Sequence, residues 1–166
     1  MNVMKRIFIE KISINIGVGE AGDKLEKAKK LLERLTNKKV VITKGKKKIP
    51  SLGIRPGLPI GVKVTLRKDI NELLKRLLEA KENMLKRKSF TSRGVSFGIE
   101  EYIHIPGMEY DPELGIMGMD INVVLQRPGF RVKRRKIKKS KVGKKHLITI
   151  DEAVKFMEEN YGVKVS

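Results

Sequence analysis

The sequence predicts an α+β fold in which a mostly antiparallel sheet carries its helices on one face and leaves the other face exposed. Two stretches alternate apolar and polar residues strictly, as strands do when only one side is buried. The predicted elements follow the order β-α-β-β-α-β-β-α, which lacks the repeated βαβ units of a parallel sheet. The 166 residues have the length of a single domain, 1–166, and contain no internal repeat.

Alternation predicts the first strand from Ile7 to Ile16. Its inward residues are Ile12, Ile14 and Ile16, and its outward residues are Lys11, Ser13 and Asn15. After a glycine-rich turn, Asp23 and Glu26 have the spacing of a capping box. An amphipathic helix is therefore expected to begin with Asp23 as its N-cap and to end near Thr36.

A long basic loop follows a short strand predicted over 40–43. The loop runs from Lys44 to Pro59, and its many Pro and Gly residues exclude a regular element, so it should project from the sheet. The next strand, from Ile60 to Arg67, alternates again. Its charged or hydroxyl-bearing outward residues are Lys63, Thr65 and Arg67. These two alternating strands share a face with hydrogen-bond donors suited to phosphate and sugar oxygens.

The second half of the chain predicts two more helices. Asp69 and Glu72 repeat the capping-box spacing and open a helix that should run to about Leu85. Thr149 and Glu152 repeat it once more and open a short amphipathic helix near the C-terminus. The segments between them are a polar connection (86–94), a strand (95–105), an acidic loop rich in Gly and Pro (105–118) and a last strand (119–126).

Positive charge is concentrated in two segments that contain no acidic residue. The net charge is +19, from 38 Lys and Arg against 19 Asp and Glu. The segment 127–145 holds eleven of the basic residues and 37–68 holds ten more, so the rest of the chain is close to neutral. Two concentrated positive segments on a neutral scaffold indicate a polyanionic partner.

Composition argues against several classes of function. The chain has no cysteine, which excludes disulfides, thiolate nucleophiles and cysteine-ligated zinc. Aromatic residues make up only 5% and Trp is absent, which favours recognition of nucleic-acid backbone and shape over base stacking. No apolar run approaches the roughly 20 residues of a membrane span, and no secretory signal is apparent. We expect a soluble cytoplasmic protein without a membrane partner.

Catalytic and metal-binding residues are not apparent. His104 and His146 lie in different contexts without partners at ligand spacing, which favours structural or surface roles. Glu100, Glu101 and Asp111 could form paired carboxylates, but a solvated face, or one for a basic partner, is the preferred interpretation. We expect no enzyme activity and no cofactor.

The turn Gly17-x-Gly19-x-x-Gly22 lies between a strand and a helix, as a dinucleotide-binding fingerprint does. The acidic residue that this fingerprint has roughly 20 positions later is missing, and so are the βαβ units. Three interpretations stay open. A plain β-to-α turn is favoured over a turn whose amides approach a phosphate of a nucleic acid, and over a nucleotide site.

Three stretches resemble one known family: EKISINIGVGEAGDKL, ITKGKKKIPSLGIRPGLPIGVKVTLR and FGIEEYIHIPGMEYDPELGIMGMDINVVLQRPG. They are similar to the ribosomal large-subunit protein L5 family in its archaeal form, and the likeness runs from about Glu10 to the C-terminal helix. The resemblance implies a protein that attaches 5S rRNA to the central protuberance of the large subunit. It also implies contacts with 23S rRNA, with P-site tRNA, and with neighbouring ribosomal proteins of the central protuberance and the small subunit.

The resemblance also implies roles for residues. The resemblance places five residues on the 5S rRNA-binding side, and these are Asn15, Gly17, Lys63, Thr65 and Arg67. Alternation puts Lys11 and Ser13 on the same exposed face, so they are expected to contact 5S rRNA as well. The loop 44–59 matches the tRNA-contacting loop, with these charges: Lys44, Lys46, Lys47, Lys48 and Arg55.

The insertion 127–145 is expected to be flexible and to neutralise rRNA phosphates. Its contributing residues would be Arg131, Lys133, Arg134, Arg135, Lys136, Lys138 and Lys139. The alternative function is that of a general nucleic-acid chaperone or a DNA-compacting protein. A nucleotide-dependent enzyme that uses the glycine turn is a third interpretation.

Overall fold

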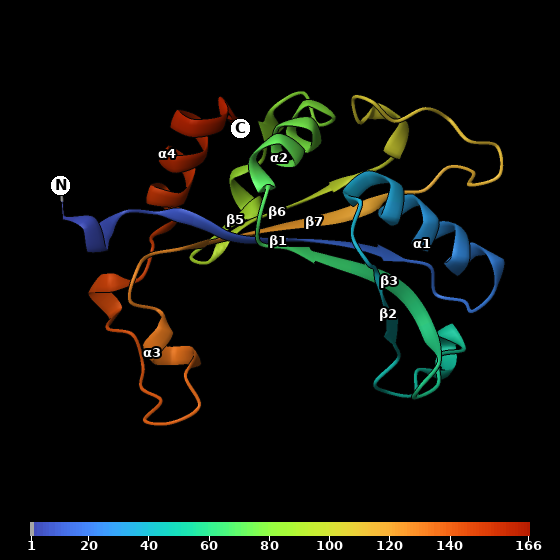
Figure 1. Ribbon diagram of the computed structural model, residues 1–166, viewed down its shortest axis with the longest axis horizontal. Helices are drawn as coiled ribbons and strands as arrows, with labels where there is room; N and C mark the ends of the chain where they lie inside the picture. Colours follow the sequence, from blue (N-terminus) through green and yellow to red (C-terminus); the bar gives the residue numbers. More distant parts are fainter. Residues whose placement is uncertain (1) are drawn as a thin grey trace.

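The computed structural model describes residues 2–166 and has a six-stranded antiparallel sheet at its centre (Figure 1). The strand order is β2-β3-β1-β7-β6-β5, and every neighbouring pair is antiparallel. The strands are β1 (Phe8–Gly17), β2 (Val41–Lys44), β3 (Pro59–Leu66), β5 (Phe90–Thr91), β6 (Gly94–Ile99) and β7 (Met119–Gln126). The predicted α+β class with a mostly antiparallel sheet is confirmed.

Helices cover one face of this sheet. Figure 1 shows α1 (Asp23–Thr36), α2 (Ile70–Glu79) and α4 (Ile150–Tyr161) on the same side, above the strands. Their apolar stripes and the inward residues of the strands form one buried cluster. A single helical turn, α3 (Arg131–Arg134), lies within the basic insertion, on the other side of the sheet from these helices.

The register of β1 against β3 confirms the alternation read from the sequence. Ile12 pairs with Leu66, Ile14 with Val64 and Ile16 with Val62, and all six side chains are buried. The positions between them pair as Ser13 with Thr65 and Asn15 with Lys63, on the face away from α1, α2 and α4. Burial of one face by apolar side chains is what sets this register, because a shift of one residue would bury the polar set.

Of the three predicted capping boxes, only the last forms. Thr149 Oγ1 accepts from the amide of Glu152 at 3.3 Å, and the Glu152 carboxylate accepts from the amide of Thr149 at 2.9 Å. At α1 the N-cap is Gly22, with φ of 132°, so Asp23 is already the first helical residue. At α2 the N-cap is Asp69 as predicted, but its left-handed backbone (φ 53°) leaves its side chain without a capping hydrogen bond.

Two predicted element boundaries are wrong because the residues near them interact with segments that are distant in sequence. The second helix ends at Glu79 rather than near Leu85, since the chain turns at Asn83 (φ 55°) and continues as β4 (Met84–Leu85). This strand pairs in parallel with β8 (Lys164–Val165) at the C-terminus.

The strand predicted over 95–105 ends at Ile99. Beyond it, Tyr102 starts a 3-10 turn, and its buried hydroxyl accepts from the amide of Asp111 at 3.0 Å. The connection predicted over 86–94 contains the short edge strand β5.

Candidate nucleic-acid interface

The open face of the sheet collects the outward residues of its central strands. Lys11, Ser13 and Asn15 are partly exposed on β1, and Lys63 and Thr65 are exposed on the neighbouring β3. At the two ends of this row lie Gly17, paired with Gly61, and Arg67, which directly follows β3 and is exposed. The structure therefore brings all seven residues predicted for 5S rRNA onto or beside one surface. We call this surface the open face.

The other side of the open face comes from strands whose polar residues the sequence analysis did not single out. Asp120 of β7 pairs with Asn15, and Asn122 of β7 pairs with Ser13. Asn122 also pairs with Ser96 of β6. The alternation over 119–126 could have shown from the sequence which residues of β7 point outward. The sequence did not show that β7 lies beside β1. The result adds polar groups and one carboxylate, that of Asp120, to a surface expected to be basic.

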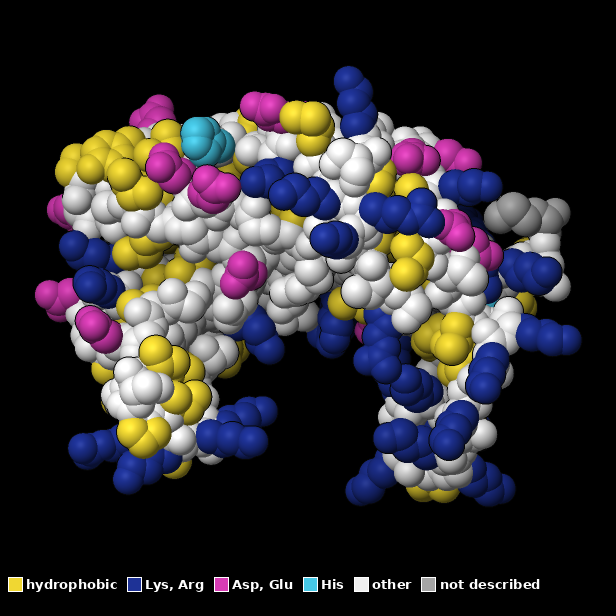
Figure 2. All heavy atoms as spheres, turned by 180° about the vertical axis from the view of Figure 1, so that it is seen from behind, with side chains coloured by type: hydrophobic (Ala, Val, Ile, Leu, Met, Phe, Trp, Pro, Cys, Tyr) yellow, Lys and Arg dark blue, Asp and Glu magenta, His cyan; other side chains and the backbone are white. Residues whose placement is uncertain are grey.

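The loop 44–59 and the insertion 127–145 project on the side of the sheet that faces away from α1, α2 and α4 (Figure 1). Figure 2 shows them as two lobes with Lys and Arg at their ends and a wide gap between the lobes. The open face is on the same side of the sheet as the two projections. The three basic features are therefore oriented toward one side of the molecule, where a single extended polyanion can reach all of them.

The loop 44–59 is a braced hairpin rather than an irregular excursion. The amide of Gly45 donates to Leu58 O at 2.8 Å, and near the tip the amide of Ile49 donates to Ile54 O at 2.9 Å. A Cβ on Gly45 would lie 2.8 Å from Arg55 O, so only glycine fits at this narrow neck. The predicted tRNA-contacting charges are all exposed on it: Lys44, Lys46, Lys47, Lys48 and Arg55.

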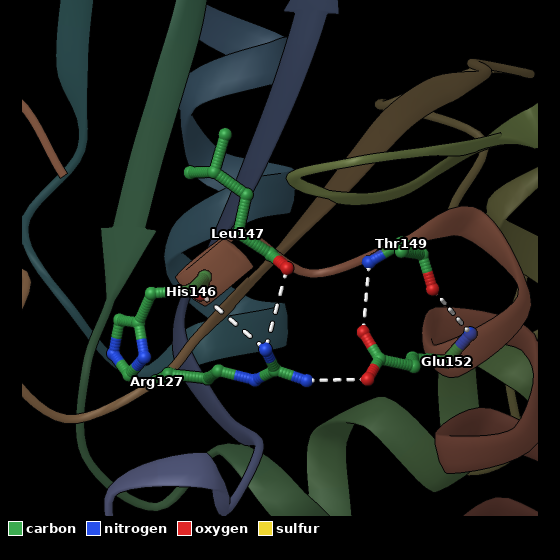
Figure 3. A network of polar contacts seen from close by, with 5 residues as sticks. All are labelled: Arg127, His146, Leu147, Thr149 and Glu152. Carbon is green, nitrogen blue, oxygen red and sulfur yellow. Dashed lines mark hydrogen bonds and ion pairs between the residues drawn. The ribbon is translucent and has the colours of Figure 1, made fainter. Parts of the chain in front are cut away.

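The insertion 127–145 is rooted in the body of the protein through Arg127 (Figure 3). Arg127 is only 5% exposed. Its Nη2 donates to the Glu152 carboxylate at 2.5 Å, and its Nη1 lies 3.3 Å from Leu147 O and 3.4 Å from His146 O. The Thr149 amide, together with Arg127, lowers the pKa of Glu152. Arg127 therefore stabilises the fold and is not a free charge for RNA.

A second arginine of the insertion also interacts with side chains of the sheet. Arg134 of α3 forms an ion pair with Glu10 of β1 at 2.6 Å and a hydrogen bond with Gln126 of β7. Sequence reasoning missed both arginines' partners, since Glu10 and Glu152 lie far from them along the chain. The other predicted phosphate contacts are exposed and form no ion pair within residues 2–166: Arg131, Lys133, Arg135, Lys136, Lys138 and Lys139.

The glycine turn after β1 uses its amides within the fold. Those of Val18 and Gly19 both donate to Ile60 O, at 2.9 and 2.8 Å. These two donors are therefore not directed at a phosphate, which supports the plain β-to-α turn over the nucleotide site.

The acidic loop is held on the helical side of the sheet. Asp111 pairs with Arg34 of α1 at 2.6 Å, and this hydrogen bond lowers the pKa of the carboxyl. Arg76 of α2 donates to Pro106 O at 2.8 Å. Within residues 2–166 no three His, Cys, Asp or Glu side chains group as metal ligands, and no helix has the length and apolarity to cross a membrane.

Comparisons with known proteins agree over nearly the whole chain. Residues 2–55 match the family model described as ribosomal protein L5, and residues 59–156 match the model for the C-terminus of the same ribosomal family. A protein of Nanoarchaeum equitans is 54% identical over 98% of this chain and 97% of its own length. A protein of Sulfolobus acidocaldarius is 49% identical over 99% of this chain and 93% of its own length. A protein of Methanosphaera stadtmanae is 45% identical over 99% of this chain and 99% of its own length. All three are named large ribosomal subunit protein uL5.

Proposed function

This chain belongs to the ribosomal protein L5 family, and from that premise we propose that its open face binds 5S rRNA and attaches it to the large ribosomal subunit. The chain is a structural ribosomal protein of archaeal type and not an enzyme. Its place is the large subunit of the cytoplasmic ribosome. The open face would contribute recognition of the RNA, and the two basic projections would contribute affinity.

The observation that carries this proposal is the row of donors on β1 and β3. Ser13 pairs with Thr65 and Asn15 with Lys63, so hydroxyl, amide and ammonium groups stand beside one another on a rigid surface. Such groups bind phosphate and 2′-hydroxyl oxygens at defined spacing. No aromatic side chain belongs to this row, which favours an RNA helix over splayed single-stranded bases.

The two projections would have separate partners. We assign the exposed charges of loop 44–59 to P-site tRNA and those of the insertion to 23S rRNA. The acidic loop, on the opposite side of the sheet, is available to neighbouring ribosomal proteins of the central protuberance and of the small subunit. An acidic surface suits partners of this kind, since proteins that bind rRNA are commonly basic.

Titration of 5S rRNA with the purified protein tests the proposal. If about eight phosphates are contacted, the logarithm of the affinity should fall with the logarithm of the salt concentration at a slope of about −6 to −7. Replacing Lys63 and Arg67 with Ala should lower the affinity for 5S rRNA. The triple replacement of Lys46, Lys47 and Lys48 with Ala should leave it nearly unchanged and weaken tRNA binding to reconstituted large subunits.

A slope near −1 would exclude binding of the RNA backbone at this scale. Equal effects of the two sets of replacements on 5S rRNA would contradict the division between sheet and loop. Equal affinity for 5S rRNA and random duplex DNA would favour a general nucleic-acid chaperone or a DNA-compacting protein instead.

A further inference from the structure

A hollow of about 500 Å³ lies within the basic insertion. Its lining comes from three separate parts of the chain: Lys133 of α3, the returning segment from Lys139 to Val142, and Leu147. The amide of Ser140 donates to Val132 O at 3.2 Å and holds the returning segment against the helical turn. The backbone of the insertion thus shapes one side of a hollow that is open to solvent.

One wall of the hollow is fixed by the buried arginine. Leu147 O lies 3.3 Å from Arg127 Nη1, and Arg127 is in turn paired with Glu152 of the capping box (Figure 3). Leu147 is therefore held by the core of the protein and not by the tip of the insertion. A wall that is positioned before any partner arrives lowers the ordering cost of binding.

The lining of the hollow combines aliphatic and cationic side chains. Val142 is half-buried and Leu147 is 40% exposed, although both are apolar. Lys133, Lys139 and Lys141 line the hollow and are exposed, and none of them pairs with an acid in the part of the chain that the structure describes. No Asp or Glu occurs from Arg127 to Ile150.

We propose that this hollow binds one unpaired nucleotide of an RNA, with its base against Val142 and Leu147 and its flanking phosphates on the three lysines. A nucleobase presents a flat, weakly polar surface only when it leaves the helical stack. A phosphate alone would need the lysines but not the aliphatic side chains of Val142 and Leu147. A lining that is partly aliphatic and partly cationic suits a nucleotide, which combines a base with charged phosphates. This inference rests on the proposed RNA binding and adds the kind of RNA feature that the insertion selects.

A pair of RNA hairpins of equal length tests the inference with the full-length protein. One hairpin is fully paired, and the other carries a single bulged 2-aminopurine, whose fluorescence reports the environment of the unpaired base. The wild-type protein should bind the bulged hairpin more tightly and change its fluorescence. Leu147→Ser should reduce that preference about tenfold, since it removes the apolar contact and leaves every charge in place.

Ile137→Ser is the matched control, because Ile137 is an apolar residue of the same insertion that is 75% exposed and does not line the hollow. It should leave the preference and the fluorescence change unaltered. The inference is overturned if the wild-type protein does not prefer the bulged hairpin, or if both replacements act alike. Titration of 5S rRNA with the same proteins separates the two proposals: unaltered 5S rRNA binding without any bulge preference removes this inference alone, whereas lack of 5S rRNA binding removes the proposed function.

Discussion

Glu152→Gln should destabilise the protein far more than Asp151→Asn, although the two carboxylates are neighbours in the first turn of α4. Both ion pairs are short: 2.5 Å for Glu152 with Arg127, and 2.6 Å for Asp151 with Arg87. Their burial differs, since the Arg127 side chain is 6% exposed and the Arg87 side chain is 67% exposed. Gln can still serve in the capping box, so the replacement mainly leaves a buried guanidinium without its counter-charge.

The expected magnitude follows from that burial. Removing one partner of a fully buried pair lowers the free energy of unfolding by about 3–5 kcal/mol. The loss is smaller where solvent screens the pair. The Glu152 side chain is 42% exposed, so we expect a loss of about 2 kcal/mol, or about 4–8 °C in Tm for a chain of this length. Asp151→Asn should cost about 0.5 kcal/mol or less, as exposed pairs do.

The pH dependence gives a second readout of the same pair. The pKa of Glu152 is lowered in the folded protein, so the pair stabilises the fold above the pKa of the unfolded carboxyl. That stability is lost as the pH falls through the lowered folded value. The difference between wild type and Glu152→Gln, measured by urea unfolding, should therefore be full at pH 7 and shrink under acid. Equal effects of Glu152→Gln and Asp151→Asn at pH 7 would refute the reasoning from burial.

Three further predictions concern the sheet and the acidic loop. Gly61→Ala should destabilise the fold by about 2 kcal/mol or more in urea unfolding, because its Cβ would lie 2.7 Å from Ile16 O. Asp120→Asn should raise the affinity for duplex RNA of any sequence about two- to threefold in filter binding. The replacement removes from the open face a negative charge that repels the RNA phosphates. Tyr102→Phe should cost about 1 kcal/mol, and hydrogen exchange should show loss of protection at the amide of Asp111, which donates to the Tyr102 hydroxyl.

Local patterns predict the central strands well but do not predict their neighbours. Alternation alone places Ser13, Asn15 and Lys63 on one face, because a half-buried strand leaves no other arrangement for its apolar residues. It contains no information that β7 lies beside β1, so the carboxylate of Asp120 next to Asn15 could not be foreseen. Strand order depends on the packing of the whole chain rather than on any one segment.

The basic insertion shows the same limit for charges. Counting Lys and Arg predicts a positive segment, but it treats Arg127 and Arg134 like their neighbours. Their acidic partners, Glu152 and Glu10, come from a helix and a strand that reach the insertion only through the tertiary fold. The predicted helix end near Leu85 is wrong for a related reason. The carbonyl of Asn83 accepts from the amide of Lys164 at 2.7 Å, which is a pairing between segments far apart in sequence.

The specificity ratio between 5S rRNA and an unrelated duplex RNA of equal length tests the central claim most directly. Asn15→Ala with Thr65→Ala removes no charge from the open face, and Lys136→Ala with Lys138→Ala removes two charges from the insertion. We predict that the first pair lowers the ratio, by weakening 5S rRNA alone, and that the second pair weakens both RNAs equally and leaves the ratio unchanged. A ratio that falls with the insertion replacements and stays constant with the sheet replacements would contradict the assignment of recognition to the open face.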